Sequence, residues 1–265
     1  TAVYADILLP ATTFLEHNDV YQAGGHQHIS LGPKLIEPVG QSRSNHEVIC
    51  GLAERLGAAH RGFAMTEWEI IDETLKKSGW DSANELRNNR WIDCQPSFED
   101  AHFLNGFAFP DGKFKFAPNW AAQGPNHSNL PTLPDHAELI EAADDTHPFR
   151  LVTAPSHNYL NTSFTETATS IEKESRPTVK LCSADAIHLN VKEGDRVRVG
   201  NKRGEIIVHV EIASDQQSGV AVIESVWPNH AFENGLGVNT LIGADAGPPN
   251  GGGVFHDSAV WIKSI

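Results

Sequence analysis

The chain has 265 residues, 40% of them hydrophobic, and carries 20 Lys and Arg against 34 Asp and Glu, a formal net charge of −14. This length and apolar content suit two domains with hydrophobic cores. Because phosphate backbones and anionic membrane surfaces select basic patches, the acidic balance excludes nucleic acid and the membrane surface as expected partners.

The sequence contains no run of about eighteen apolar residues, so it predicts no membrane-spanning helix. Its three cysteines, Cys50, Cys94 and Cys182, are far apart and form no CxxC pair. This spacing excludes a self-contained iron–sulfur or zinc-ribbon site and fits a reducing compartment, which predicts a cytoplasmic location. The chain opens on Thr1, close to an apolar segment, and we interpret it as a fragment whose missing part would hold any export signal.

The first predicted element covers residues 4–9, a short apolar segment that ends at Pro10. We expect a parallel strand of an α/β sheet, which delivers a loop at its carboxyl end. That loop is either a wall of a cofactor funnel or a solvated loop with a helix cap, and the composition favours the second. Its polar residues are Thr12, Thr13, Glu16, His17, Asn18 and Asp19.

Two helices are predicted next. Ser44 is the expected N-cap of the first, with Glu47 as its capping-box partner, and Gly57 ends it. Thr66 caps the second helix, which runs to Lys77. We expect the first helix to bury one apolar stripe, made of Val48, Ile49, Leu52, Ala53 and Leu56.

The predicted linker covers residues 123–135, which are rich in Pro, Asn and Gly, and a short acidic helix is expected near residues 136–145. We therefore place a domain boundary between residues 148 and 149. Residues 1–148 form one part of the chain, and residues 149–265 form a separate domain.

Residues 149–265 show the pattern of a compact β-barrel with one helical turn. Strands are predicted at residues 149–152, around Val197 and Val199, at residues 206–212 and at residues 219–226, the last apolar enough to be buried on both faces. Ser183 caps and begins a helix that ends near Leu189. Turns are expected at residues 192–195 and 201–204.

An unusually polar loop follows the first barrel strand. Its residues include Thr153, Ser156, His157, Asn158, Asn161, Thr162, Ser163 and Thr165. Hydroxyls and amides in such a loop suit base edges, ribose hydroxyls and phosphate oxygens, whereas the plain alternative is an ordinary turn region. A second loop, around Asn239, is rich in glycine, and we expect both loops to lie side by side at one mouth of the barrel.

A family resemblance is spread over more than a hundred residues. It is carried by Asp185, Ala186, Leu189, Gly194, Asp195, Val197, Val199, Asn201, Arg203 and Gly204, by the polar loop after Leu151, and by Asn239 before Asp245. Residues 149–265 thereby resemble the molybdopterin-dinucleotide-binding domain that closes the chain of molybdenum and tungsten oxidoreductases of the dimethyl sulfoxide reductase type, which includes formate dehydrogenases and nitrate reductases.

The first part of the chain resembles the domain that precedes the barrel in this family, in residues 5–16 and 41–57. It departs from the family at Gly24, Gly25 and His26, where relatives usually carry an Asn…Glu-Gly-Arg element, so the role of this loop stays open. The resemblance implies an incomplete Rossmann-like α/β part followed by a mostly-β double-psi barrel of the aspartate-decarboxylase-like type.

The resemblance also implies a function. The whole protein would be a molybdopterin-dependent oxidoreductase, and this chain would bind the guanine dinucleotide end of the molybdopterin cofactor. The molybdenum or tungsten, its protein ligand and any iron–sulfur cluster would belong to missing N-terminal domains of the same protein, so the chain alone would be inactive. The alternative is a stand-alone double-psi barrel that serves as a binding or interaction module without this cofactor.

The residues that the resemblance assigns to cofactor binding are Thr153, Ala154, Pro155, Ser156, His157, Asn158, Asn161, Thr162, Ser163, Trp227, Asn239, Thr240 and His256. Asn239 stands where relatives place an asparagine on the pterin side, and His256 where many carry Lys or Arg. No catalytic residue and no metal ligand is assigned to this chain. His26 and His28 could bind zinc, but the spacing suggests no third ligand, and no serine has the context of a nucleophile elbow.

Overall fold

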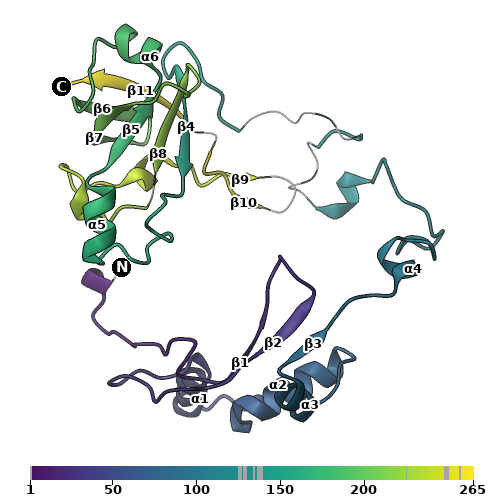
Figure 1. The fold of residues 1–265 in the computed structure, drawn as a ribbon. Helices are drawn as coiled ribbons and strands as arrows, with labels where there is room; N and C mark the ends of the chain where they lie inside the picture. The colour runs from purple at the N-terminus through teal and green to yellow at the C-terminus, as the bar shows by residue number, and fades with distance from the viewer. Residues whose placement is uncertain are drawn as a thin grey trace. The chain divides into compact units, whose positions relative to one another are not determined.

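The computed structural model describes residues 2–124, 127, 130–133, 135, 140–224, 226–247, 251–256 and 258–265. The chain divides into two compact units, Thr1–Phe114 and Lys115–Ile265 (Figure 1). No helix within the described ranges combines the length and apolar character needed to cross a lipid bilayer. The boundary between residues 148 and 149 stays a prediction; residues 136–139 of the expected acidic helix lie outside the described residues, and residues 140–145 form no helix.

The first unit is an α/β unit with a small antiparallel sheet in the order β1-β2-β3. Its strands are β1 (Asp19–Gln22), β2 (His28–Gly32) and β3 (Trp91–Asp93), and its helical elements are η1 (Ala2–Tyr4), α1 (Asn45–Leu56), η2 (Arg61–Ala64), α2 (Glu67–Lys77), α3 (Ala83–Asn89) and α4 (Phe98–Ala101). Helices α2 and α3 contribute Ile71, Leu75, Ala83 and Leu86 to its core, against which Val20, Ile29 and Leu31 of the sheet pack.

Local helix signals are confirmed in this unit. Ser44 and Thr66 both form capping boxes, and Gly57 ends α1 in the left-handed region at φ 66°. The predicted burial of the α1 stripe is wrong, because Ile49, Leu52 and Leu56 are 53%, 50% and 81% exposed and only Ala53 is buried. Apolar spacing fixes which residues share a helix face, but burial requires a neighbouring element to cover that face.

The strand predicted at residues 4–9 is also absent from the structure. Tyr4 ends the short helix η1, and Ile7, Leu8 and Leu9 are exposed without strand geometry. A strand is stabilised by hydrogen bonds to a neighbour, and the β1-β2-β3 sheet of this unit does not pair with these residues. The segment is apolar, as predicted, but no strand pairs with it among the described residues of the unit.

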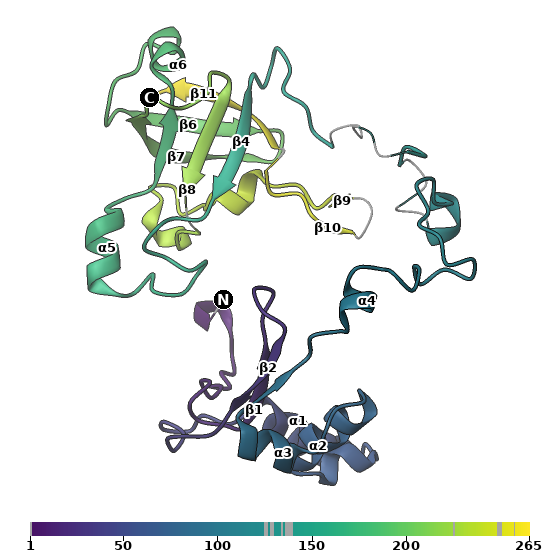
Figure 2. The same ribbon diagram turned by 45° about the vertical axis from the view of Figure 1, so that its right-hand side comes forward.

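The second unit contains a closed barrel in the order β11-β4-β8-β5-β7-β6 (Figures 1 and 2). Its strands are β4 (Phe149–Ala154), β5 (Thr178–Leu181), β6 (Arg196–Asn201), β7 (Gly204–Ile212), β8 (Val220–Glu224) and β11 (Ser258–Ser264). Strand β8 lies between the consecutive strands β4 and β5, and β5 lies between the consecutive strands β7 and β8. These are two interlocked psi crossings, so the double-psi barrel is confirmed.

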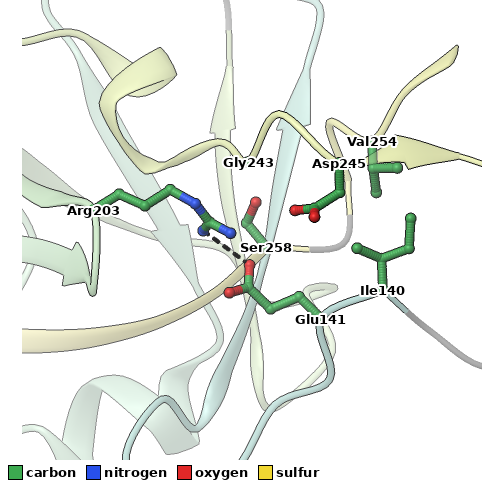
Figure 3. A pocket seen from close by; sticks show the side chains of 7 residues that line it. All are labelled: Ile140, Glu141, Arg203, Gly243, Asp245, Val254 and Ser258. Carbon is green, nitrogen blue, oxygen red and sulfur yellow. Dashed lines mark hydrogen bonds and ion pairs between the residues drawn. The ribbon is translucent and has the colours of Figure 1, made fainter. Parts of the chain in front are cut away.

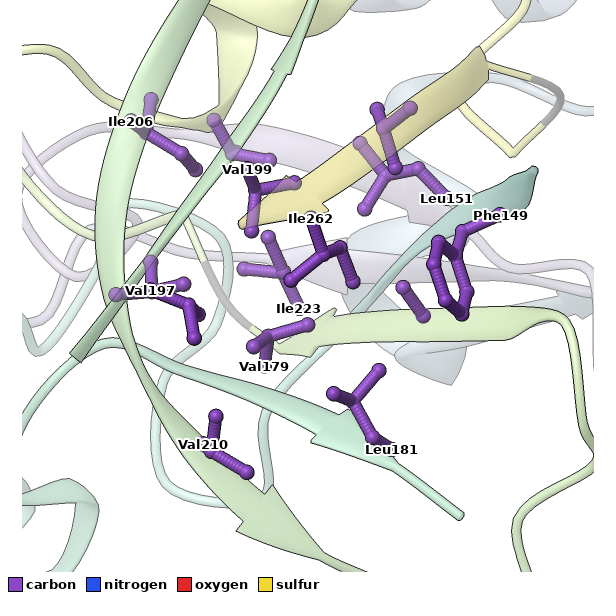
Figure 4. Close-up of a cluster of buried hydrophobic side chains, with 14 of the residues drawn as sticks. Phe149, Leu151, Val179, Leu181, Val197, Val199, Ile206, Val210, Ile223 and Ile262 are labelled. Carbon is purple, nitrogen blue, oxygen red and sulfur yellow. The ribbon is translucent and has the colours of Figure 1, made fainter. Parts of the chain in front are cut away.

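Alternating apolar residues fill the barrel (Figure 4). Val197 and Val199 of β6 point inward with Ile206, Val208 and Val210 of β7, and all are at most 1% exposed. The expectation that residues 219–226 are buried on both faces is wrong: in β8, Ala221 and Ile223 are buried whereas their neighbours are half-buried. A closed barrel gives each strand one inner face, and the outer face of β8 is only partly covered.

Short connections close one end of the barrel. Helix α6 (Ser183–His188) lies there, capped by the Cys182 sulfur rather than by Ser183 as predicted. The Asp185 carboxylate is buried and accepts hydrogen bonds from the Ser218 hydroxyl at 2.7 Å and the Gly219 N–H at 2.8 Å. Helix α5 (Ala168–Glu174) lies beyond the opposite end (Figures 1 and 2).

Candidate functional site

The strand directions bring the predicted site loops to one end of the barrel. Strand β4 runs parallel to β8, antiparallel to β11 and opposite to β5, which runs parallel to β7. Consequently one end of the barrel, here called the loop end, carries the loop after β4, the β6–β7 turn and the long segment between β8 and β11. The opposite end carries helix α6 and is here called the α6 end. The prediction that Ser156 and Asn239 lie at the same mouth is confirmed.

Part of the polar loop after β4 holds the loop itself together. The Thr153 hydroxyl donates to the Phe255 carbonyl at 3.0 Å, and the buried Ser156 Oγ accepts from the Tyr159 N–H at 3.1 Å. The Asn158 N–H and Nδ2 both donate to Glu174 Oε1 of α5, at 2.9 and 2.8 Å. These predicted site residues thus have structural partners within the loop end.

Another part of the same loop faces outward. Leu160 and Ser163 exchange backbone hydrogen bonds across a tight turn, in which Asn161 has a φ of 52°. The predicted site residues of the loop that are exposed are Pro155, His157, Asn161, Thr162 and Ser163, while Ala154 is half-buried at the end of β4. Within the described part of the chain, the His157, Asn161 and Ser163 side chains make no hydrogen bond. Their donors and acceptors are therefore open to a ligand.

A buried aromatic pair lies beneath this loop. Tyr159 and Trp227 pack edge to face, with ring centroids 5.1 Å apart and an interplanar angle of 86°, and both belong to the barrel core. The Tyr159 hydroxyl is buried without a hydrogen-bond partner in the described ranges. Trp227 was predicted from the sequence, but Tyr159 was missed, although an aromatic residue inside a polar run was a usable signal.

The second loop contains the short helix η6 (Val238–Leu241). Its buried residues Val238 and Leu241 anchor it, which leaves Asn239 exposed and Thr240 half-buried. A Cβ at Gly204 would lie 2.6 Å from the Thr240 methyl carbon, so a glycine in the β6–β7 turn permits this close approach. Asn239 is therefore held in place by the buried residues of η6 on either side of it.

His256 adjoins the first loop through its backbone. Its carbonyl accepts a hydrogen bond from Arg150 Nε at 3.1 Å, and its imidazole is exposed. Because Thr153 bonds the neighbouring carbonyl of Phe255, the segment that carries His256 is tied to β4 at two points. The structure thus brings His256 to the loop end together with the residues that follow β4.

The polar cluster of the first unit is a self-supporting loop. The buried Glu16 carboxylate accepts from the Thr13 N–H at 2.6 Å, the Thr13 hydroxyl at 2.9 Å and the Val39 N–H at 2.6 Å, and these hydrogen bonds, chiefly the one from the Thr13 backbone, lower the pKa of Glu16. Thr12 and His17 are also hydrogen-bonded, at 2.8 Å. Because no helix begins at residues 12–19, the helix cap predicted for this loop is absent, and these residues form a loop held by its own hydrogen bonds.

The candidate zinc pair lies in the same unit. The His26 and His28 rings contact each other, and His28 also packs edge-on against Trp91. No group of three or more metal-ligating side chains occurs among the described residues. The assignment of no metal ligand to this chain stays a prediction.

Comparisons with known proteins place these observations in a family. A family described as "Molydopterin dinucleotide binding domain" matches residues 149–259, and one described as "Molybdopterin oxidoreductase" matches residues 1–55. The chain belongs to the molybdopterin oxidoreductase family. Its barrel is the dinucleotide-binding domain of that family, and the predicted cofactor, molybdopterin guanine dinucleotide, is the one that this domain implies.

Several relatives of this family are similar over most of the chain. The probable oxidoreductase YoaE of Bacillus subtilis is 30% identical over 100% of this chain, and the dimethyl sulfoxide/trimethylamine N-oxide reductase of Rhodobacter capsulatus is 27% identical over 93%. The chain spans 38% and 34% of their lengths. Acetylene hydratase from Pelobacter acetylenicus has the same fold, with a TM-score of 0.74 at 17% identity over 97% of this chain and 38% of its own.

The residues at the loop end fit the dinucleotide. The exposed side chains of the first loop offer hydroxyl, amide and imidazole groups for a base, a ribose and phosphates. The orphaned Tyr159 hydroxyl adds a buried polar atom beneath them. The acidic charge of the chain does not oppose this fit, because residues 149–265 carry only 13 of its 34 Asp and Glu.

Proposed function

We propose that this chain supplies the dinucleotide-binding part of a molybdenum or tungsten oxidoreductase. The observation that carries the proposal is the set of exposed, unpartnered polar side chains after β4, at the same end of the barrel as Asn239. When bound, the cofactor supplies redox or oxygen-atom-transfer chemistry at its metal. The residues of this chain bind and orient the guanine nucleotide end, and none is given a catalytic role.

The residues that would hold the nucleotide divide by their surroundings. His157, Asn161, Thr162 and Ser163 are placed to hydrogen-bond the base and ribose, and Asn239 lies on the pterin side. Thr153, Ser156 and Asn158 fix the loop, with Ala154 and Pro155 setting its exit from β4. Trp227 supports the loop from the core through its contact with Tyr159, and Thr240 packs on Gly204. His256 stands at the position where many relatives carry Lys or Arg.

The partner that we propose for the first unit is the rest of a longer polypeptide like that of the relatives. The exposed stripe of Ile49, Leu52 and Leu56 supports this, because an apolar helix face of this size is normally covered. The catalytic metal would be held by that partner, so the chain alone would be inactive. A stand-alone barrel module is not favoured, because residues 1–55 also match the oxidoreductase family.

Nucleotide titration followed by NMR tests the proposed site. Each neutral hydrogen bond contributes about 0.5–1.5 kcal/mol, so GDP is expected to bind the chain with an affinity near the millimolar range. Shifts should concentrate in residues 153–163 and 227–256, with GDP and GMP preferred over ADP and AMP. Shifts confined to other residues, or a preference for adenine nucleotides, would contradict the proposal.

A further inference from the structure

We infer that Glu141 and Arg203 form a positioning pair that holds η6, and with it Asn239 and Thr240, in place for the dinucleotide. The inference rests on the proposed function of the loop end. Neither residue belongs to the predicted site, and the pair would act through the backbone of η6 rather than by touching the ligand.

The pair connects four segments of the barrel domain (Figure 3). Arg203 Nη1 donates to Glu141 Oε2 at 3.1 Å and to the Leu241 carbonyl of η6 at 3.1 Å. The same Glu141 oxygen accepts from the Ala259 N–H of β11 at 3.3 Å. One ion pair therefore joins the residues before β4, the β6–β7 turn, η6 and the start of β11.

The β6–β7 turn presents Arg203 in a fixed direction. Asn201 Oδ1 accepts from the Arg203 N–H at 2.9 Å, and Asn201 Nδ2 donates to the Leu241 carbonyl at 2.8 Å. The Leu241 carbonyl thus accepts from both side chains of the turn, while Thr240 packs against Gly204. The turn and η6 behave as one unit, and Arg203 links this unit to Glu141.

Close packing supports the same conclusion. A Cβ added at Gly243 would lie 2.8 Å from Arg203 Nη2 and 2.7 Å from the Asp245 carboxylate, so the guanidinium lies directly against the backbone that follows η6. Ile140, Val254 and Ser258 line the same small cavity (Figure 3). The Arg203 and Glu141 side chains are only 20% and 19% exposed.

This burial makes the pair more than a surface ion pair. Loss of Glu141 leaves the Arg203 charge without its carboxylate partner, whereas after loss of Arg203 the mostly exposed Lys202, 3.9 Å away, still lies beside Glu141. In both cases the hydrogen bonds that join these elements are broken or weakened. The planar guanidinium serves a carboxylate and a carbonyl together, whereas a lysine ammonium at the same position is a point charge on a flexible stem. Lysine should therefore keep the charge but lose the double contact.

The test compares single and double variants of the full chain. Arg203→Lys, Glu141→Gln and the combination Glu141→Gln with Arg203→Met would be measured for GDP affinity by NMR and for hydrogen exchange of the Thr240 and Ile242 amides, which bond within the η6 region. Arg198→Met is the matched control, because Arg198 forms an ion pair with Glu205 at 3.7 Å on the same hairpin with both side chains nearly half exposed.

We expect Arg203→Lys and Glu141→Gln each to weaken GDP binding about tenfold and to speed exchange in η6, as a small misplacement of a binding group does. The double variant should bind GDP more weakly than Glu141→Gln, because Arg203→Met also removes the hydrogen bond that Arg203 donates to the Leu241 carbonyl. The Arg198→Met control should leave both readouts unchanged, and the barrel core amides should keep their protection in every variant.

Two results would overturn the inference: unchanged η6 exchange in both single variants, or weaker GDP binding that the Arg198→Met control shares. If the unmodified chain binds no GDP, the proposed function fails instead, and the exchange of the η6 amides still decides whether the pair orders η6. If Arg203→Lys does not fold, Glu141→Gln, which retains an oxygen acceptor for Arg203 and Ala259, gives the decisive comparison.

Discussion

The two ends of the barrel are built from the same strands but use their polar residues differently. At the α6 end, Asp185 and Asp195 accept hydrogen bonds from the backbone of the end itself, and Asp185 is buried. At the loop end, His157, Asn161 and Ser163 are exposed, with no side-chain hydrogen bond in the described part of the chain. One end is closed by its own contacts, and the other leaves polar side chains exposed.

This difference teaches that family-signature residues and ligand-binding residues need not coincide. Asp185, Gly194 and Asp195 carry much of the resemblance, yet they lie at the α6 end and fix turns there. Gly194, for example, has a φ of 80°, which favours glycine. Signature residues at this end are therefore explained by the fold, and we propose the binding site at the other end.

The largest expected effect is a loss of stability, without a loss of GDP affinity, when the α6 end is changed. Asp185→Ala leaves the Ser218 hydroxyl and the Gly219 N–H without their acceptor, and we expect the free energy of unfolding to fall by about 3 kcal/mol. Urea denaturation measures this loss. GDP affinity of the folded variant should stay unchanged, because the proposed nucleotide site lies at the loop end.

The exposed Asp215, between β7 and β8 at the same end, provides the control. Asp215→Ala should change the unfolding free energy by less than about 0.5 kcal/mol. Equal losses in the two variants would show that the buried carboxylate of Asp185 has no special role in closing the α6 end.

The second prediction concerns the ties within the loop end. Asn158→Ala removes the Nδ2 hydrogen bond to the Glu174 carboxylate, and we expect a loss of about 1–2 kcal/mol in unfolding free energy together with faster hydrogen exchange in residues 155–163. Thr169→Ala, at an exposed position of α5, should do neither. If hydrogen exchange in residues 155–163 is unchanged in Asn158→Ala, contacts other than the Asn158–Glu174 hydrogen bond order the loop.

The sequence predicted the backbone more completely than the site. The capping box at Ser44, the cap at Thr66, the strands β4, β6, β7 and β8, and the common end of the two loops follow from local patterns and chain direction. Composition could not distinguish Asn158, which is tied to α5, from Asn161, which is exposed, because that difference depends on the position of Glu174. The Glu141–Arg203 contact joins residues 62 positions apart, and although Arg203 belongs to the pattern that carries the resemblance, no motif includes Glu141.

The exposed stripe of α1 shows a different limit. Its spacing was read correctly, but whether Ile49 and Leu52 are buried depends on what covers the helix, which the spacing does not contain. The same reason accounts for residues 4–9, whose apolar character predicted a strand although the described part of the unit contains no strand that pairs with them.

The third prediction isolates the exposed part of the loop end. Ser163→Ala should leave the unfolding free energy unchanged within about 0.5 kcal/mol, because its hydroxyl has no partner in the described structure. If that hydroxyl binds the nucleotide, GDP affinity should fall about two- to tenfold, equivalent to a hydrogen bond of about 0.5–1.5 kcal/mol. Ser183→Ala, at an exposed position of the α6 end, should not alter GDP affinity, and equal affinities in all three proteins would remove Ser163 from the site.

The smallest expected effect is a pH dependence of stability that comes from His209, on strand β7 between the two ends of the barrel. His209 lies beside Arg196, Arg176 and Glu233. Burial, and next the charge of Arg176, lower the pKa of His209 below its ordinary value of 6.5, so the folded barrel favours the neutral imidazole. Because protonation favours the unfolded chain, stability should be highest above pH 6.5 and should fall as the pH drops through 6.5 toward the lower folded pKa.

Denaturation of the chain at pH 7.5 and pH 5 measures this effect, and His209→Gln should make the loss of stability between these two values smaller. Asp144, whose pKa is held at about 2 chiefly by the Thr146 hydroxyl, stabilises the fold equally at both pH values, because its stabilisation is lost only as the pH falls below its ordinary pKa of 3.8. His188→Gln, at an exposed position of α6, is the control and should retain the full pH dependence. If His209→Gln loses as much stability between pH 7.5 and pH 5 as the unmodified chain, groups other than His209 cause the loss.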